Sequence, residues 1–534
     1  MNRNDSLIAQ LRRELATTAS FQKLLGADRI DVTGLAVEAR ALTIATLQQS
    51  LKKRIAVIVP GDAAIDDFES ALRLFHRESR CVSAYPSPSL SPYQDLSPSL
   101  GVVREEIQAL GMLSAAELDV LIIPARVLFS RMPRADEFAN RMIRLQQGTE
   151  IDTRAILERL VENGFVRTDL VGEAGEFAFR GGILDVFPPN APKPLRLELF
   201  GDTIDSLRQF DVETQRSEEA IDNASILPMT QFAITRDTRS ALARRLSLDF
   251  MEPLFKRDVA EKIDRLNEHG NFLGIENYAA IATETVAFSE YIRDWDIILI
   301  EPDQITTNVV KFESLLRAEY EGAAAKGRAV YPPEKLTTPG PEVLTFLGGA
   351  RIAMSEVHIM TREFAELRLH APQVDRYQNR LSEFAADVKK NRGRRQIFFT
   401  ATKGGHEKIE RLSKEFEFTL EISPGTLARG FEFEDINLTA YSEWDLFEPP
   451  TSTRVGGRKR TSDAFATDLR DLKVGDYIVH VDHGVGRFHG LQRIPFGETE
   501  REVMEIEYSG GGKLLMPMEN LNLIQKYSGG ADTQ

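Results

Sequence analysis

Residues 172–211, GEAGEFAFRGGILDVFPPNAPKPLRLELFGDTIDSLRQFD, carry the most informative pattern in the chain. Within them, residues 195–200 alternate leucine with Arg196, a glutamate and Phe200, the pattern of a strand whose leucines face a core. The Gly-Asp pair that follows predicts a turn into a second strand at 204–210. A large ring beside an arginine on the polar face is typical of a protein-binding surface. The alternative is that another part of the chain covers Phe200.

The preceding strand is predicted at 177–187 and carries Arg180 immediately before Gly181 and Gly182. A glycine pair inside a strand pattern indicates a bulge or a close approach of another backbone. Two prolines then end the strand. The region is therefore expected to be rich in hairpins.

The motif EFAFRGGILDVFPP, followed by LRLELFGDTIDSLRQFD, resembles a domain shared by two families. They are the excision-repair protein UvrB and the transcription-repair coupling factor, and in both the domain binds the excision-repair protein UvrA. The resemblance implies that Arg180, Arg196 and Phe200 contact UvrA. The corresponding α+β hairpin domain is placed at residues 142–227.

Composition predicts a multidomain globular protein, because 534 residues with 42% hydrophobic and 28% charged side chains exceed one domain. No apolar run reaches membrane-spanning length and the amino terminus is charged rather than signal-like, so a cytoplasmic location without a membrane partner is expected. The single cysteine, Cys81, permits neither an intramolecular disulfide nor a cysteine zinc site. A net charge of -15 removes any global electrostatic argument for nucleic acid and favours protein partners.

The first part of the chain has the order of a nucleotide-binding module but lacks its phosphate loop. One amphipathic helix is predicted within 1–28, followed by a strand that ends near Gly34. A phosphate loop of the form G-x-x-x-x-G-K-[ST] would place its second glycine, lysine and hydroxyl where this chain has Ala39, Arg40 and Ala41. We therefore predict a degenerate helicase-like module that binds no ATP.

Short apolar runs at 54–60, 120–124 and 297–301, each followed by a helical pattern, predict one parallel sheet. Because the third run has the same strand-then-helix pattern but comes after the hairpin domain, that domain is expected to be inserted into the sheet module. The predicted module then consists of residues 1–141 and 228–338.

The proline-rich segment 85–98 is expected to be an ordered loop. It resembles the corresponding segment of the coupling factor, which leads into SPSLGVVREEIQAL. UvrB carries a long aromatic hairpin at this place and holds damaged DNA with it, whereas this chain has only Tyr85 and Tyr93. We interpret both tyrosines as packing residues and expect no damage recognition.

A small α/β domain of unknown role is predicted at 339–445, with a buried-type strand at 395–402. Its basic cluster, residues 389–395, is either a solvated helix end or a nucleic-acid patch, and no aromatic residue is interleaved for base stacking. Residues 446–468 have the composition of a flexible linker.

Five short strands at 469–534 predict a small CarD/Tudor-like β-barrel. The motif VGDYIVHVDHGVGRFHGL with EIEYSGGGKLLMPMENLNLIQKYSGG resembles the RNA-polymerase-interacting domain of the coupling factor, also found in CarD-type regulators. The resemblance implies docking on the RNA polymerase β subunit through Arg487, Phe488, Leu491 and Ile494. The alternative for Leu491 and Ile494 is that they line the barrel.

No metal site is predicted, because His480, His483 and His489 occur without an acidic or thiol ligand to complete a set. The resemblance covers nearly the whole chain in the family's domain order. The family continues into a double-stranded DNA translocase that uses ATP and Mg, but this sequence contains neither a G-K-[ST] loop nor a D-E-x-x box. We expect an amino-terminal portion without the motor, neither an enzyme nor a cofactor-binding protein.

The function expected from these features is that of an adaptor between RNA polymerase and UvrA in transcription-coupled nucleotide excision repair. One alternative is a UvrB-like ATP-dependent helicase or damage-binding protein. Another is a transcription regulator that acts through the barrel alone, which would leave Arg180, Arg196 and Phe200 without a partner.

Overall fold

The structure is a computed structural model. It describes residues 3–447 except 64, 77–78, 89, 95–97, 99, 234 and 357–364, and after 447 it describes residues 475, 477–480, 484–496, 499–508, 513–517 and 524–526. Within that last part, side chains are described at 475, 487–490 and 504–507.

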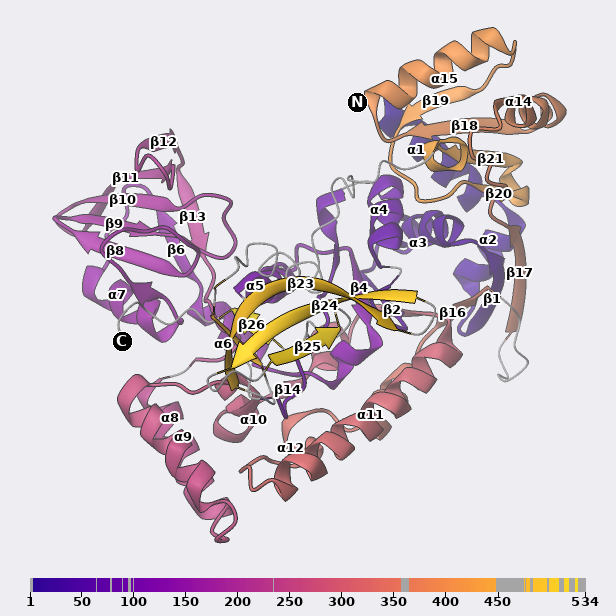
Figure 1. The fold of residues 1–534 in the computed structure, drawn as a ribbon. Helices are drawn as coiled ribbons and strands as arrows, with labels where there is room; N and C mark the ends of the chain where they lie inside the picture. Colours follow the sequence, from indigo (N-terminus) through magenta and orange to yellow (C-terminus); the bar gives the residue numbers. More distant parts are fainter. Residues whose placement is uncertain are drawn as a thin grey trace.

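A seven-stranded parallel sheet, in the order β17-β1-β16-β15-β2-β4-β3, forms the centre of the molecule (Figure 1). The predicted α/β fold with a parallel sheet is confirmed. The strands are β1 (Ile30–Leu35), β2 (Ile55–Val59), β3 (Val82–Ala84), β4 (Val120–Pro124), β15 (Asp296–Ile300), β16 (Ile352–Ser355) and β17 (Ala365–Ala371).

Helices cover both faces of this sheet, because alternate side chains of its buried strands point in opposite directions. Val57 of β2 packs with α1 to α4, whereas Ile58 packs with α5, α11 and α13. The first layer contains α1 (Arg3–Ala16), α2 (Ala19–Gly26), α3 (Val37–Leu51) and α4 (Ile65–Phe75). The second contains α5 (Leu100–Ser114), α11 (Pro302–Ala325) and α13 (Gly340–Gly348).

The single helix predicted within residues 1–28 is wrong, since α1 and α2 are separate helices. The break occurs at Thr18, whose extended backbone and side-chain hydroxyl cap α2 by accepting the backbone N–H of Phe21. Threonine is favoured at such a cap, and this local preference overrides the apolar periodicity.

The sheet also extends past the predicted domain boundary at residue 339. β16 pairs with β1 and β15, and β17 pairs with β1, so residues 352–355 and 365–371 belong to the first sheet. The packing interpretation of the proline-rich segment is confirmed for its tyrosines: Tyr85 and Tyr93 are buried, and the Tyr93 hydroxyl donates to the carbonyl of Tyr331 over 3.0 Å.

The hairpin domain contains a six-stranded sheet in the order β12-β11-β10-β9-β8-β7, packed on α7 (Thr153–Glu162). The chain enters it along β6 (Ile143–Gln146) and leaves along β13 (Asn223–Ile226), and these two strands pair with each other. The sheet strands are β7 (Val166–Arg167), β8 (Glu176–Arg180), β9 (Ile183–Val186), β10 (Leu195–Phe200), β11 (Thr203–Phe210) and β12 (Ser217–Ala220).

After β17 the chain forms a second small sheet, in the order β19-β18-β21-β20. It is covered by α14 (Leu381–Lys390) and α15 (Lys403–Glu415). Phe399 and Phe431 of this sheet each pack edge-on against Phe75 of α4, with ring centroids 6.2 and 6.1 Å apart. The two units therefore share one apolar core. The strands are β18 (Arg395–Thr400), β19 (Glu421–Pro424), β20 (Phe431–Phe433) and β21 (Leu438–Ser442).

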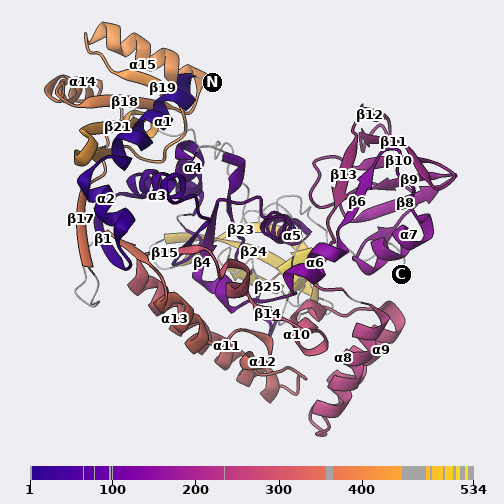
Figure 2. The ribbon, with the colours of Figure 1, turned by 180° about the vertical axis from the view of Figure 1, so that it is seen from behind.

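Seen from both sides, the hairpin domain and this second sheet lie at opposite ends of the central module (Figures 1 and 2). A pair of helices, α8 (Arg236–Asp249) and α9 (Lys256–His269), follows the hairpin domain. The remaining α-helices of the described residues are α6 (Ala135–Arg141), α10 (Ala279–Ala282), α12 (Pro333–Leu336) and α16 (Glu443–Leu446).

The last unit is an antiparallel sheet in the order β25-β24-β23-β22-β26. Among the residues described there, no pairing joins β25 to β26, so the predicted barrel is not confirmed. Its strands are β22 (Tyr477–His480), β23 (Gly484–Phe496), β24 (Thr499–Tyr508), β25 (Lys513–Pro517) and β26 (Ile524–Lys526).

Candidate partner-binding surfaces

Two hairpin turns bring two of the predicted UvrA-contacting residues, Arg180 and Phe200, to one end of the hairpin domain's sheet, whereas Arg196 lies near the start of β10. Gly181 and Gly182 have φ angles of 59° and 86° and connect β8 to β9 as a two-residue turn, with Arg180 opposite Ile183. The bulge is not found, whereas the alternative of a close backbone approach is met by β10, whose Leu199 N–H donates to the Gly182 carbonyl over 2.8 Å. The single strand predicted at 177–187 is wrong, because β8 and β9 are separate strands. Two successive positive φ angles are what a type I′ hairpin turn requires, and glycine adopts them without steric cost.

The second turn joins β10 to β11 and places Phe200 opposite Thr203. Both β8 and β10 run antiparallel to β9, so the carboxyl ends of β8 and β10 lie at the same end of the sheet. Phe200 is 82% exposed, which makes it the most exposed of the large apolar side chains described. The alternative that another part of the chain covers Phe200 finds no support in the described residues.

The register of the sheet shows which side chains share a face. Arg196 lies opposite Asp185 on β9, and Glu198 lies opposite Ile183. Ile183 in turn lies opposite Arg180 on β8. Since alternate residues of a strand point to the same side, all these side chains lie on the face that is turned away from α7.

Arg196 is held firmly on this face. Its Nε and Nη2 donate to the two carboxylate oxygens of Asp185 over 2.7 and 2.9 Å, and its Nη1 donates to the carbonyl of Gln215 over 3.0 Å. The guanidinium lies over the ring of Phe210, 4.5 Å from its centroid. The hydrogen bond to Asp185 raises the pKa of Arg196.

Asp185 and Phe210 were not identified from the sequence. Asp185 is separated from Arg196 by a loop, and only the strand register brings the two together. The available signal was the alternation of Asp185 with core residues of β9, which places a carboxylate on the polar face of the strand.

The degenerate phosphate loop is a tight connection between β1 and α3. Gly34 has φ 83°, and a Cβ there would lie 2.1 Å from the carbonyl oxygen of Leu369. Ala39, Arg40 and Ala41 lie within the buried first half of α3. These three side chains thus belong to the packed interior.

Charged groups beside this connection are engaged internally. Nη2 of Arg40 donates to Oε1 of Glu301 over 2.6 Å, and its Nε donates to the carbonyl of Leu35. Glu38, in the first turn of α3, accepts the backbone N–H of Arg429 over 2.9 Å. Burial raises the pKa of the Glu38 carboxyl to about 7, although that hydrogen bond opposes the shift.

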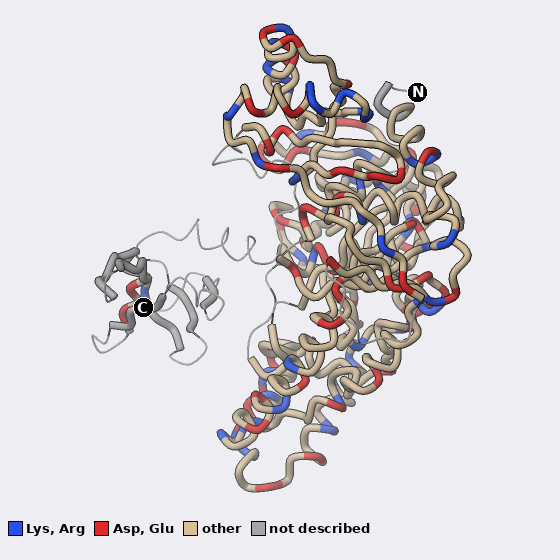
Figure 3. The backbone as a smooth tube through the Cα atoms, turned by 90° about the vertical axis from the view of Figure 1, so that its right-hand side faces the viewer, with Lys and Arg blue, Asp and Glu red and all other residues tan. Residues whose placement is uncertain are grey.

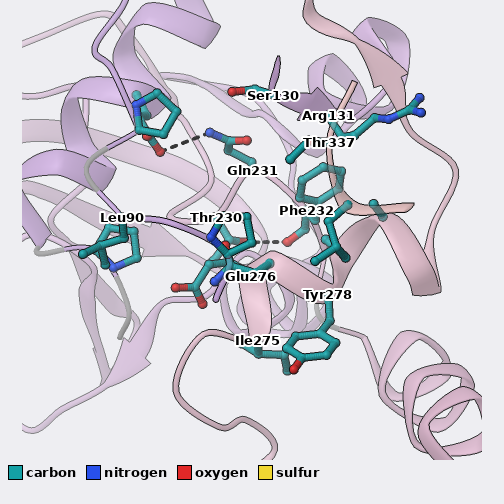
Figure 4. Close-up of a pocket in the computed structure, with 18 of the residues that line it drawn as sticks. Leu90, Ser130, Arg131, Thr230, Gln231, Phe232, Ile275, Glu276, Tyr278 and Thr337 are labelled. Carbon is teal, nitrogen blue, oxygen red and sulfur yellow. Dashed lines mark hydrogen bonds between the residues drawn. The ribbon is translucent and has the colours of Figure 1, made fainter. Parts of the chain in front are cut away.

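A cavity of about 290 Å³ lies where the chain returns from the hairpin domain (Figure 4). Met229 to Ala233 form one wall, and the Gln231 amide donates to the carboxyl of Glu106 over 3.1 Å. Burial raises the pKa of Glu106 to about 8. Carboxylates and arginines both line this cavity, so its charge defines no ligand class; they are Glu106, Glu276, Arg126, Arg131 and Arg239.

In the last sheet, Arg487 is exposed and its Nε donates to the carbonyl of Gly475 over 3.1 Å. Phe488 is 6% exposed and is therefore a buried residue. Leu491 and Ile494 lie in β23, but their side chains are outside the described residues. The same is true of the His480 side chain and of all of His483, whereas His489 pairs with Glu507.

The basic cluster at 389–395 is partly neutralised. Arg394 pairs with Glu432, and Arg395 pairs with Glu14 and Glu421. The remaining basic residues of the cluster are exposed at the end of α14 and just after it: Lys389, Lys390 and Arg392. Figure 3 shows acidic and basic residues intermixed along the described chain. This supports the solvated helix end.

In the part of the chain that the structure describes, no helix is long and apolar enough to cross a membrane. No group of three or more His, Cys, Asp and Glu side chains in that part of the chain is arranged to hold a metal ion.

These features define a class of protein: a multidomain α/β protein whose parallel-sheet module carries small sheet domains, one of them with an exposed aromatic-arginine surface. Comparison with known families makes the class specific. Residues 143–232 match the model of the UvrB interaction domain, and residues 472–528 match that of the CarD-like/TRCF RID domain.

Known relatives agree with both matches. The chain is 26% identical over 99% of its length to the transcription-repair-coupling factors of Staphylococcus aureus (strain USA300) and Staphylococcus epidermidis (strain ATCC 12228 / FDA PCI 1200). It spans about half the length of these curated relatives, 47% of each. The predicted resemblance to the transcription-repair coupling factor is thereby confirmed.

Proposed function

We propose that this chain is the adaptor part of a transcription-repair coupling factor, which recruits UvrA to RNA polymerase for nucleotide excision repair. The observation that carries the proposal is the surface of exposed Arg180, half-buried Arg196 and exposed Phe200 inside a region that matches the UvrB interaction domain. An aromatic anchor flanked by arginines is the composition of a binding hot spot.

The second partner in this proposal is the RNA polymerase β subunit, bound by the last sheet. The match to the CarD-like/TRCF RID domain supports this assignment. Exposed Arg487 fits a docking role, and Leu491 and Ile494 remain candidates on the same strand. Because Phe488 is buried, we assign it to the interior of the sheet instead of to the contact surface.

We further propose that the central module binds no nucleotide and that this chain catalyses no ATP hydrolysis. Phosphate binding needs a glycine-rich loop with free backbone N–H groups and a lysine. The connection from β1 to α3 is too short to form that loop, and Arg40 is committed to Glu301. The module is then a scaffold that keeps two docking domains on one chain, which raises the local concentration of one partner near the other.

Calorimetric titration of purified UvrA into this chain tests the first docking surface. We expect the parent to bind and the triple variant Arg180→Ala, Arg196→Ala, Phe200→Ala to lose binding while it stays folded. A matched control removes two exposed arginines and one exposed apolar residue of the same domain, Arg154, Arg167 and Val161. The proposal is overturned if a folded parent shows no binding, or if the control loses as much affinity as the triple variant.

Binding to RNA polymerase core enzyme tests the second surface. The variant Leu491→Ala, Ile494→Ala is expected to bind more weakly than the parent and to retain UvrA binding. Nucleotide binding is tested separately, by measuring the melting temperature of the protein with and without Mg-ATP. ATP hydrolysis, or a rise in melting temperature that saturates with ATP, would contradict the scaffold role of the module and favour a UvrB-like enzyme.

Both proposed partners act on DNA, so we expect the chain in the bacterial cytoplasm.

A further inference from the structure

We propose that Asp185 is the positioning residue of the UvrA-docking surface: it holds Arg196 so that the end of the guanidinium faces an acidic side chain of the partner, beside an apolar contact formed by Ile183 and Phe200. This inference rests on the proposed function and specifies the chemistry of the same surface.

Three of the five N–H groups of Arg196 are hydrogen-bonded within the domain. A guanidinium has five N–H groups, one on Nε and two on each terminal nitrogen. Asp185 accepts one from Nε and one from Nη2, and Gln215 accepts one from Nη1. One N–H therefore remains on each terminal nitrogen of Arg196.

The two remaining N–H groups of Arg196 suit a carboxylate acceptor. Asp185 occupies the edge of the guanidinium formed by Nε and Nη2, so the two N–H groups that remain are one on Nη2 and one on Nη1, beside the Gln215 carbonyl. Two donors on one rigid fork match the two oxygens of a carboxylate. The Arg196 side chain is 17% exposed, which leaves room for contact from one side. The partner group is therefore predicted to be an aspartate or glutamate.

Arg196 is already ordered before the partner binds. A free arginine loses rotamer freedom when it is ordered at an interface, and this entropic cost weakens binding. Arg196 is already fixed by Asp185 and by stacking on Phe210, so this cost is met in the unbound protein. Asp185 is itself buried, at 6% side-chain exposure, and has no surface of its own to offer a partner.

The apolar part of the surface lies toward the two hairpin turns. Phe200 is 82% exposed and Ile183, on the neighbouring strand and the same face, is 38% exposed. Arg180 lies opposite Ile183 at the first turn. We infer that Ile183 packs against the partner next to the Phe200 ring, although sequence reasoning had not selected it.

The test of Asp185 is the variant Asp185→Asn, compared in the UvrA titration with Asp169→Asn, the same change at an exposed position of the same domain. Positioning predicts that Asp185→Asn weakens binding about three- to tenfold. A purely electrostatic role predicts the opposite sign, because removing a negative charge beside Arg196 strengthens attraction to an acidic partner. Asp169→Asn is expected to leave the affinity unchanged.

A double-mutant cycle separates positioning from loss of fold. In the Arg196→Ala background, Asp185→Asn should cause no further loss of affinity, since it has nothing left to hold. An equal loss in both backgrounds, or unchanged affinity of Asp185→Asn in the parent background, would overturn the assignment of Asp185.

The apolar contact is tested by Ile183→Ala against Val161→Ala, a control that is 60% exposed on α7. Ile183→Ala should weaken UvrA binding at least threefold, and the control should not. Unchanged affinity of Ile183→Ala removes Ile183 from the surface. Failure of the proposed function is distinguishable, because in that case the folded parent itself does not bind UvrA.

Discussion

Nη2 of Arg40 lies 2.6 Å from Oε1 of Glu301, at the position where a phosphate loop would place its lysine. Glu301 starts α11 with a φ of 52°, and the same oxygen accepts the backbone N–H of Glu356 over 2.8 Å. The positive charge that a nucleotide site would aim at phosphate is here used to tie α3 to the start of α11. This ion pair suits a module that serves as a scaffold.

Arg40→Ala is expected to lower the free energy of unfolding by about 3 kcal/mol, because it leaves the partly buried Glu301 carboxylate without its cation. Urea denaturation at neutral pH measures the change. Arg13→Ala, at an exposed position of α1, should change stability by less than about 0.5 kcal/mol. Equal stability of the two variants would show that the Arg40–Glu301 pair contributes little.

Phe200→Ala is expected to leave the melting temperature unchanged, because the ring is 82% exposed and packs little within the chain. The same change should cost at least about 2 kcal/mol of UvrA binding free energy, the size typical of an interface anchor. Calorimetry and thermal denaturation of the same preparation provide both numbers. A stable variant that binds like the parent would exclude Phe200 from the interface.

Glu38→Gln is expected to stabilise the protein at pH 8 and to have little effect near pH 4.5. The folded-state pKa of Glu38, about 7, lies above its usual value of 4.5 because burial disfavours the charged carboxylate. Stability from the protonated group is therefore full below pH 4.5 and is lost as the pH rises through 7. Above that pH the gain from glutamine should be on the order of 3 kcal/mol.

Urea denaturation of parent and Glu38→Gln across pH 4.5 to 8.5 measures this difference. Asp445 and Asp67 also raise the Glu38 pKa and stay unchanged in the variant. A stability difference that does not vary with pH would contradict the raised pKa.

Gly34→Ala is expected to destabilise the protein by more than about 2 kcal/mol. A methyl group there meets the Leu369 carbonyl of β17 and must adopt a φ of 83°. Gly26→Ala is the control, because a Cβ at the end of α2 meets no atom within 4 Å. Comparable melting temperatures for both variants would mean that β17 moves away at little cost.

Local sequence patterns predicted the structure correctly where it depends on residues within one strand or one motif. The alternation at residues 195–200 predicted that Phe200 faces away from the core, and the structure confirms that it is exposed. The apolar runs at β2, β4 and β15 predicted a parallel sheet, which is confirmed. Alternation and buried-strand runs are set by residues close together in the chain, so they can be read directly.

Patterns failed where pairing with a distant segment decided the structure. Buried and exposed side chains alternate along β17, as in any half-buried strand. Nothing in residues 365–371 indicates that this strand pairs with β1, which lies on the other side of the domain boundary predicted at residue 339. The Asp185–Arg196 pair likewise depends on the register of β9 and β10. Residues 177–187 were predicted as one strand, with a bulge or a close backbone approach at Gly181-Gly182, because one strand and a hairpin have the same apolar residues around this pair.

The antiparallel pair of β6 and β13, with Ile143 opposite Ile226, brings the two ends of the hairpin domain side by side. The domain can therefore be removed and its neighbours rejoined by a few residues, without stretching the chain on either side. It can also be transplanted as a cassette into another loop whose ends are equally close. In evolutionary terms, such a junction allows one docking domain to be shared between proteins whose remaining parts have diverged.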